Sequence, residues 1–184
     1  MDQTERFLSR MFQIDTNRIN SRGHLENMNT LEKWRKDGVI LMEMSEVAQK
    51  ECVVDRNPKR VEKTLGYIFS ETLAETTEEQ ELLTRIERIL FPEGAKTQNE
   101  RNDVEIVFNA KKYGSILVTA DGGSKSQPGG ILGHKEELAG LGIQVMSDEE
   151  AVQHVRGFIA ARDRQATWKH ERFGMPLPDW VGKD

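Results

Sequence analysis

Four acidic residues, Asp15, Glu51, Asp103 and Asp121, lie at the ends of expected strands or in expected helices. Asp15 and Asp121 each follow a short apolar run, at 12–14 and 115–119. Glu51 lies in a helix expected after a serine cap, and Asp103 is expected to open another helix. We expect these four carboxylates to converge in one acidic pocket at the carboxyl-terminal edge of a sheet.

Such a pocket has a chemical consequence. Several ionised carboxylates in one place repel each other and raise each other's pKa, and a divalent cation reverses that cost. Hard oxygen ligands without histidine or cysteine nearby favour Mg²⁺ or Mn²⁺ over zinc. Taken singly, each acid also has a structural explanation, as a turn residue, a charge at a helix start or a solvated side chain. The case for a cation site therefore depends on the four occurring together.

Apolar runs and helical periodicity alternate along the chain. Strands are expected at 12–14, 39–44, 115–119 and 142–146, and helices at 24–36, 46–54, 58–65, 76–90, 103–113, 131–139 and 148–164. This alternation predicts an α/β/α sandwich with a central, mainly parallel sheet of about four to five strands. In such sheets the ligand lies beyond the carboxyl ends of the strands, where Asp15 and Asp121 fall.

The length of 184 residues suits one domain. We expect a single domain over 1–165, with a helical segment at about 55–100, and a C-terminal tail over 166–184 docked on it. Trp168, Phe173 and Trp180 are the residues expected to dock.

Charge and cysteine content narrow the class of protein. Lys and Arg number 26 against 31 Asp and Glu, a net charge of −5, so no global basic field indicates nucleic acid, although a local basic face is compatible with it. Cys52 is the single cysteine, which excludes an intramolecular disulfide. No apolar run has the length of a signal-peptide core or a membrane span, so a cytoplasmic protein without a membrane partner is expected.

The order and spacing of several short motifs resemble those of the PIN-domain nucleases. An aspartate closing the first strand is followed by threonine and asparagine, at residues 15–17. Ser45 is followed six residues later by Glu51 in SEVAQKE. The most specific segment is DVEIVFNAKKYGSILVTAD, which starts at Asp103 and ends at Asp121. The resemblance spans residues 10–158.

The resemblance implies a metal-dependent endoribonuclease, similar to the toxin-type ribonucleases, that hydrolyses RNA phosphodiester bonds with Mg²⁺ or Mn²⁺. It implies that the four acids are catalytic residues and metal ligands and that Asn17 and Thr119 support them. An antitoxin-like protein partner and a homodimer are compatible with it. Glu46 competes with Glu51, because both follow Ser45 in the same helix.

Two features depart from the family pattern. About fifty residues separate Glu51 from Asp103, more than a compact toxin-type member needs. After Asp121 the chain reads GGSKSQPGGIL, where many members carry a further acid. Basic residues are weak candidates for RNA contacts, with a solvated helix face as the alternative; they are Arg56, Lys59, Arg60, Lys111 and Lys112.

Two other functions compete with the nuclease. A non-catalytic domain of the same fold would keep the acids as a structural cation site and bind RNA or protein. A magnesium-dependent phosphatase-like hydrolase also begins with an aspartate after its first strand. It needs a second aspartate two residues later, where this chain has Asn17.

Overall fold

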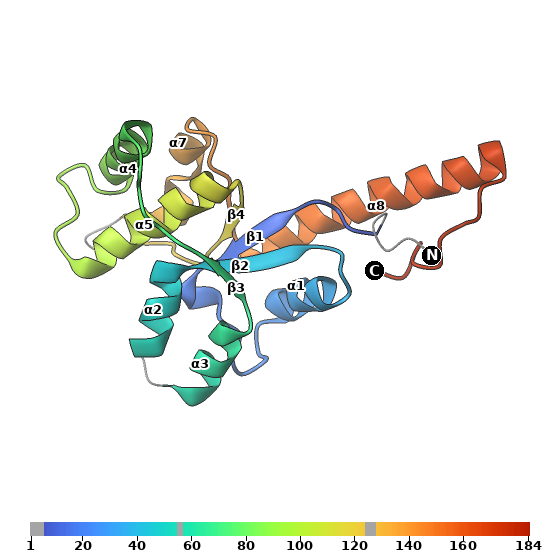
Figure 1. Cartoon of the computed structure of the whole chain (residues 1–184), viewed down its shortest axis with the longest axis horizontal. Coiled ribbons are helices and arrows are strands. Elements are labelled where there is room, and N and C mark those ends of the chain that lie inside the picture. The colour runs from blue at the N-terminus through green and yellow to red at the C-terminus, as the bar shows by residue number, and fades with distance from the viewer. Residues whose placement is uncertain (1–5, 55–56, 124–127) are drawn as a thin grey trace.

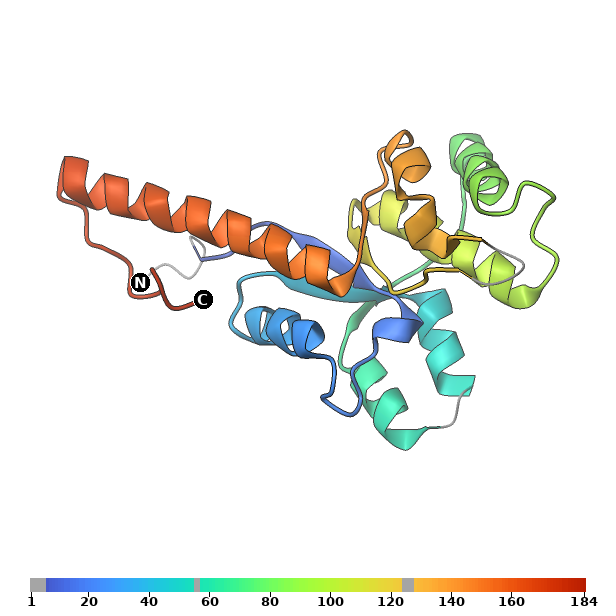
Figure 2. The ribbon, with the colours of Figure 1, turned by 180° about the vertical axis from the view of Figure 1, so that it is seen from behind.

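The computed structural model of the chain describes residues 6–54, 57–123 and 128–184. Its centre is a five-stranded, entirely parallel sheet with the strand order β3-β2-β1-β4-β5. Helices α1 and α8 pack together on one side, and α4, α5 and α7 gather on the other (Figures 1 and 2). The predicted α/β/α class with a parallel sheet is confirmed.

The elements have the following bounds. The strands are β1 (Met11–Ile14), β2 (Leu41–Ser45), β3 (Ile68–Ser70), β4 (Ile116–Val118) and β5 (Val145–Met146). The helices are α1 (Glu26–Lys36), α2 (Glu46–Val54), α3 (Pro58–Leu65), α4 (Thr77–Leu90), α5 (Gln98–Tyr113), α6 (Gly130–Gly133), α7 (Lys135–Ala139) and α8 (Asp148–Phe173), with a 3₁₀ turn, η2, at Thr16–Arg18. Among the described residues, no helix is long and apolar enough to cross a bilayer.

The strand order fixes where a ligand site can lie. From β1 the chain winds outward through β2 to β3, then returns to β4 on the other side of β1 and continues to β5. The winding direction therefore reverses between β1 and β4. In open parallel sheets the crevice outside the carboxyl ends of the strands at such a reversal is the usual ligand site.

The central strands are buried on both faces because helices cover both. Phe12 and Ile14 are fully buried on one face, and Gln13 and Glu43, which pair across β1 and β2, are buried on the other. The Gln13 amide donates to the carbonyl oxygen of Ile106 in α5 at 2.7 Å. Burial raises the pKa of Glu43, whose carboxyl accepts a hydrogen bond from Ser115. The Gln13 side chain thus joins strand β1 to helix α5.

Three assignments differ most from the prediction. Helix α5 begins at Gln98, capped by Thr97, so Asp103 lies in its second turn and does not open it. The helical segment at about 55–100 also contains strand β3, which the sequence left unassigned. Helix α8 continues to Phe173 and ends at Gly174 in the left-handed conformation, nine residues beyond the predicted end. The predicted domain boundary at residue 165 falls inside this helix, and the division itself stays a prediction.

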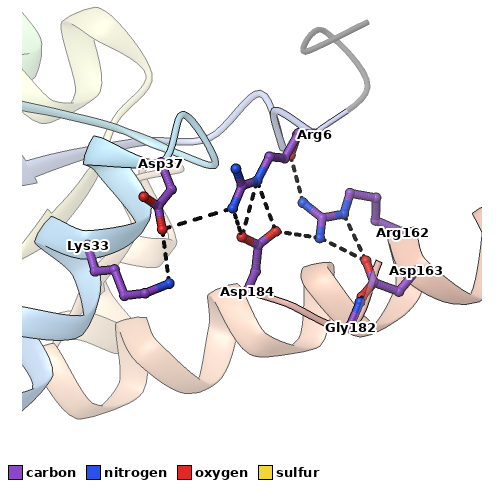
Figure 3. Close-up of polar contacts among 7 residues, drawn as sticks. All are labelled: Arg6, Lys33, Asp37, Arg162, Asp163, Gly182 and Asp184. Carbon is purple, nitrogen blue, oxygen red and sulfur yellow. Dashed lines mark hydrogen bonds and ion pairs between the residues drawn. The ribbon is translucent and has the colours of Figure 1, made fainter. Parts of the chain in front are cut away.

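The C-terminal residues return along α8 towards the N-terminal segment (Figure 1). Figure 3 shows the Asp184 carboxylate between two arginines, with Arg6 Nε at 3.1 Å and Arg162 Nη2 at 2.8 Å. Arg162 also lies over the Trp180 ring, 4.2 Å from its centroid, and Trp180 is buried.

The other two aromatic residues expected to dock do not. Trp168 and Phe173 are exposed near the end of α8 and contact each other edge to face, 5.1 Å between ring centroids. The last turns of α8 extend beyond the sheet (Figure 2).

Candidate active site

The carboxyl ends of β1 and β4 bring the first two polar residues of the site together. Ile14 and Val118 are partners in the parallel register, so Asp15 and Thr119 follow side by side. The Asp15 backbone N–H donates to the Val118 carbonyl oxygen at 3.0 Å, which extends the pairing by one residue. Both side chains are buried at the reversal of the winding direction.

Asp15 is 3% exposed and is held by three hydrogen-bond donors. Its Oδ2 accepts from the Thr119 hydroxyl at 2.6 Å and from the Asn17 amide at 2.6 Å, and its Oδ1 lies 3.0 Å from the Thr16 hydroxyl. Burial raises the pKa of Asp15, these hydrogen bonds oppose the rise, and the Glu51 charge adds to it. Both predicted supporting residues, Asn17 and Thr119, therefore contact the Asp15 carboxylate.

Glu51 reaches the same place from helix α2. The Thr16 hydroxyl lies 3.0 Å from Glu51 Oε2 as well as 3.0 Å from Asp15 Oδ1. A hydroxyl has one proton, so it can satisfy only one of these two carboxylates at a time. The other oxygen, Oε1, accepts from the Asn102 amide at 2.5 Å.

The structure places only one of the two competing glutamates in the cluster. Glu46 forms an ion pair with Lys50 at 2.6 Å, and its charge acts on Glu105. Glu51 acts on both Asp15 and Asp103. Glu51 is thus the member of helix α2 that faces the other acids.

Asp103 has a strongly perturbed carboxyl group. It is half-buried, and its pKa is raised to about 7, first by burial and then by the charges of Asp15, Asp121 and Glu51, with a smaller effect of Glu100. Within the described part of the chain, no hydrogen-bond donor reaches this carboxyl group. The four predicted acids therefore lie near enough to repel one another at Asp103.

Asp121 is also used by the backbone of its own loop. Its carboxylate accepts from the N–H groups of Gly123 at 3.1 Å and Ile131 at 2.8 Å. Gly130 allows this arrangement, since a Cβ there would lie 2.6 Å from Asp121 Oδ1 and 2.4 Å from the Gly123 nitrogen. Its φ of +56° also favours glycine. Asp121 therefore acts as a turn residue, as considered from the sequence, and its charge also acts on Asp103.

The described residues contain no group of three acidic, histidine or cysteine side chains arranged to hold a metal ion. The hydrogen bonds give the physical reason. Thr16 and Asn102 hold the Glu51 carboxylate, and loop N–H groups hold that of Asp121. The cluster therefore gathers negative charge, but Asp15, Glu51 and Asp121 already accept hydrogen bonds with which a bound ion would compete.

A cleft of about 680 Å³ adjoins the cluster on the Glu51 side. Lys50 of α2 and Arg60 of α3 line one wall, and the first turns of α5 line the other, with the amides of Gln98 and Asn102. Arg60 also donates to the Thr16 carbonyl oxygen at 2.6 Å. Cationic and amide groups thus surround the acids on this side.

The basic residues singled out from the sequence lie in different places. Arg60 borders the cleft, whereas Lys59 is exposed in a separate groove between α1 and α3. Lys111 and Lys112 lie at the far end of α5, where Lys111 contacts the Gly142 carbonyl oxygen at 3.3 Å. Lys112 binds the Leu73 carbonyl oxygen at 2.7 Å and pairs with Glu75 and Glu79. Arg56 lies outside the described residues.

Two residues of the site were not found from the sequence. Asn102 precedes Asp103 and holds Glu51, but the late helix start assigned to α5 left it outside the helix. Arg18 ends the 3₁₀ turn after Asp15, where its guanidinium donates to the Asn17 carbonyl oxygen at 3.0 Å and pairs with Asp148 at 3.3 Å. Arg18 thereby ties the Asp15 turn to the start of α8, and no local motif marks it.

No protein-family model and no curated protein matches this chain. Among solved structures, it is similar to that of VapBC2 from Rickettsia felis bound to a DNA fragment from their promoter, with 14% identity and a TM-score of 0.49. The match covers 74% of this chain and 98% of the other. A likeness of this degree assigns no function.

Proposed function

We propose that this chain is a cytoplasmic, metal-dependent endoribonuclease of the PIN type that hydrolyses RNA phosphodiester bonds at the cluster of Asp15, Glu51, Asp103 and Asp121. One observation carries the proposal. The Asp103 carboxyl has its pKa raised to about 7, by burial and by three neighbouring carboxylates, in a position without hydrogen-bond donors from the described residues. Such uncompensated charge at a sheet-edge crevice is typical of a functional site.

The donor set fits a hard divalent cation, Mg²⁺ or Mn²⁺, because it consists of carboxylates without histidine or thiolate. Asp15 and Asp103 would hold the ion, joined by Glu51 and Asp121 after these exchange their present hydrogen bonds. When bound, the cation would neutralise charge on the scissile phosphate and lower the pKa of an attacking water.

The chain's own residues prepare this site. The Thr119 hydroxyl and the Asn17 amide hold Asp15 Oδ2 in place, which leaves the carboxylate oriented before any ligand arrives. Lys50 and Arg60 border the adjoining cleft and provide positive charge for a phosphate backbone.

The sequence motifs support the choice of RNA, because their order resembles that of the PIN-domain nucleases. On the same resemblance we propose an antitoxin-like protein as the partner that restrains the activity. The cleft beside Glu51 is the entrance that such a partner would need to cover.

A cleavage assay tests the proposed activity. Wild-type chain is expected to cut a fluorescent RNA of mixed sequence with Mn²⁺ present and not with a chelator. Asp103→Asn is expected to reduce the rate at least about a hundredfold, since it removes one of the carboxylates that would hold the ion. The exposed Asp179→Asn serves as the matched control and should keep the full rate. Cleavage retained in Asp103→Asn would exclude these acids as the catalytic group.

A non-catalytic domain is the second candidate, and the hydrogen bonds that hold Glu51 and Asp121 away from a ligand arrangement favour it. Calorimetric titration with Mn²⁺ beside the cleavage assay separates the two. Heat of binding that disappears in Asp103→Asn, without any RNA turnover by the wild type, would assign the scaffold role.

A further inference from the structure

A groove of about 960 Å³ runs between helices α1 and α3, which lie next to each other (Figure 2). Basic side chains outnumber acidic ones along it. The basic residues of its lining are Lys33, Arg35, Lys36, Lys59 and Lys63, and the acidic ones are Glu32 and Glu62. The groove is therefore positively charged, although the whole chain carries a net charge of −5.

Two of these basic residues are held in ion pairs. Lys63 Nζ lies 2.5 Å from Glu32 Oε2, and Glu32 Oε1 accepts from the Tyr67 hydroxyl at 3.0 Å. Lys33 pairs with Asp37, one turn further along α1, at 2.9 Å. The pair of Lys63 and Glu32 joins α3 to α1, so it fixes the spacing between the two walls of the groove.

The other basic residues of the groove keep their charge free for a ligand. Arg35 donates to the Gly66 carbonyl oxygen, a neutral partner that orients the guanidinium. Lys36 and Lys59 are exposed on opposite walls and form no ion pair within the described part of the chain. The lining holds one further carboxylate, that of the exposed Glu62. Positive charge that no carboxylate neutralises, on both walls of a groove, is typical of a surface that binds a polyanion.

The groove adjoins the cleft beside Glu51, with the first turn of α3 between them. Lys59 lines the groove, and the next residue, Arg60, lines the cleft. The segment that follows β1 also borders both hollows, with Thr16 at the cleft and Asn20 at the groove. A row of phosphates can therefore extend from the groove over α3 towards the acidic cluster.

We propose that the groove between α1 and α3 binds the phosphate backbone of a single-stranded RNA, which continues from there into the cleft at the acidic cluster. Lys36 and Lys59 contact phosphates from the two walls, and Arg35 adds a third positive charge. Such contacts position the strand and carry no base specificity. The choice of RNA rests on the proposed nuclease, but the binding itself requires no metal ion, because none of these side chains belongs to the acidic cluster.

Fluorescence anisotropy with a labelled single-stranded RNA of mixed sequence, in a chelating buffer that prevents cleavage, tests the groove. Lys36→Gln combined with Lys59→Gln should weaken binding by about tenfold and lower the slope of log K against log salt concentration by about 1.4, since each phosphate contact contributes about 0.7. Lys96→Gln combined with Lys183→Gln is the matched control, because both lysines are exposed, the net charge changes equally and neither lines the groove. An unchanged affinity and salt slope in the groove variant overturn the proposal, as does an equal loss in the control.

Two additions to this assay separate the groove from the nuclease and from a protein partner. When Mn²⁺ is added, a wild-type chain that cuts no RNA, beside a groove variant that has lost binding, rejects the nuclease and supports the groove. Cleavage by the wild type, beside unchanged binding in the groove variant, rejects the groove alone. A glutamate-rich peptide of the same charge that displaces the labelled RNA as well as unlabelled RNA does would assign the groove to an acidic protein and contradict the proposal.

Discussion

The pKa of Asp103 shows the electrostatic cost of placing several acids in one cluster. Burial and three like charges raise its pKa to about 7 from the ordinary 3.8. The folded chain therefore binds this proton more tightly than the unfolded chain does. By linkage, the stabilising contribution of the protonated group is complete below pH 3.8 and is lost as the pH rises through about 7.

Removal of this charge is expected to stabilise the fold at pH 8 without divalent cations. Asp103→Asn should raise the free energy of unfolding by roughly 1 to 3 kcal/mol, because each pKa unit corresponds to about 1.4 kcal/mol and the group is partly solvated. The gain should vanish near pH 4. Urea denaturation in a chelating buffer measures both. A variant less stable than wild type at pH 8 contradicts the repulsion, and Asp179→Asn should show no gain.

The sequence can predict which residues lie together where strand ends decide their position. Asp15, Asn17 and Thr119 were expected together, and they form one hydrogen-bonded group, since adjacent parallel strands must end side by side. The partners of Asp121 depend on a loop conformation in which Gly130 adopts a positive φ. No spacing rule predicts such a contact.

At the level of elements, capped helices were predictable and short polar segments were not. Ser45 caps α2 as expected, with its hydroxyl accepting from the Ala48 N–H at 3.2 Å. The start of α5 was placed too late because 98–103 has no apolar residue to reveal the helical period, although Thr97 and Glu100 form a capping box. Strand β3 has three residues, too few to show an alternating pattern.

The tight loop between β4 and α6 can be tested by substituting Gly130. Gly130→Ala should lower the free energy of unfolding by about 2 kcal/mol, because the residue has φ +56° and the added methyl group meets Asp121 and Gly123. Gly157→Ala, in the open interior of α8, should instead raise it by about 0.5 to 1 kcal/mol. Thermal unfolding of the two variants compares them, and an unchanged Gly130→Ala would contradict the tight loop.

The molecule as a whole is closed by contacts between its two ends. Arg6 and Arg162 both bind Asp184, and Asp163 accepts from the Gly182 N–H at 2.8 Å (Figure 3). Burial opposes ionisation of Asp184, but the two arginines outweigh it, and its pKa is lowered. Contacts between such distant residues leave no periodic pattern, so the sequence indicated a docked tail and Trp180 but not the charged residues that hold the tail.

Loss of the Asp184 charge should weaken the contacts between the two ends of the chain. Asp184→Asn is expected to lower the free energy of unfolding by about 2 kcal/mol at pH 7, since two charge-assisted hydrogen-bond partners lose their acceptor. A carboxyl with a lowered pKa stabilises the fold above its unfolded pKa, and that contribution is lost as the pH falls through the folded value. The difference between variant and wild type should therefore shrink in acid. A difference that grows in acid would contradict the ion pairs.

The proposed function requires that one cation binds among Asp15, Glu51, Asp103 and Asp121. Anomalous diffraction from crystals soaked in Mn²⁺ tests it most directly. We expect a manganese peak bound by Asp15 and Asp103. Glu51 or Asp121 should turn from its present partner, Asn102 or the N–H of Ile131, towards the ion. A saturating soak that leaves these carboxylates without a peak, and with Glu51 and Asp121 in their present hydrogen bonds, would contradict it.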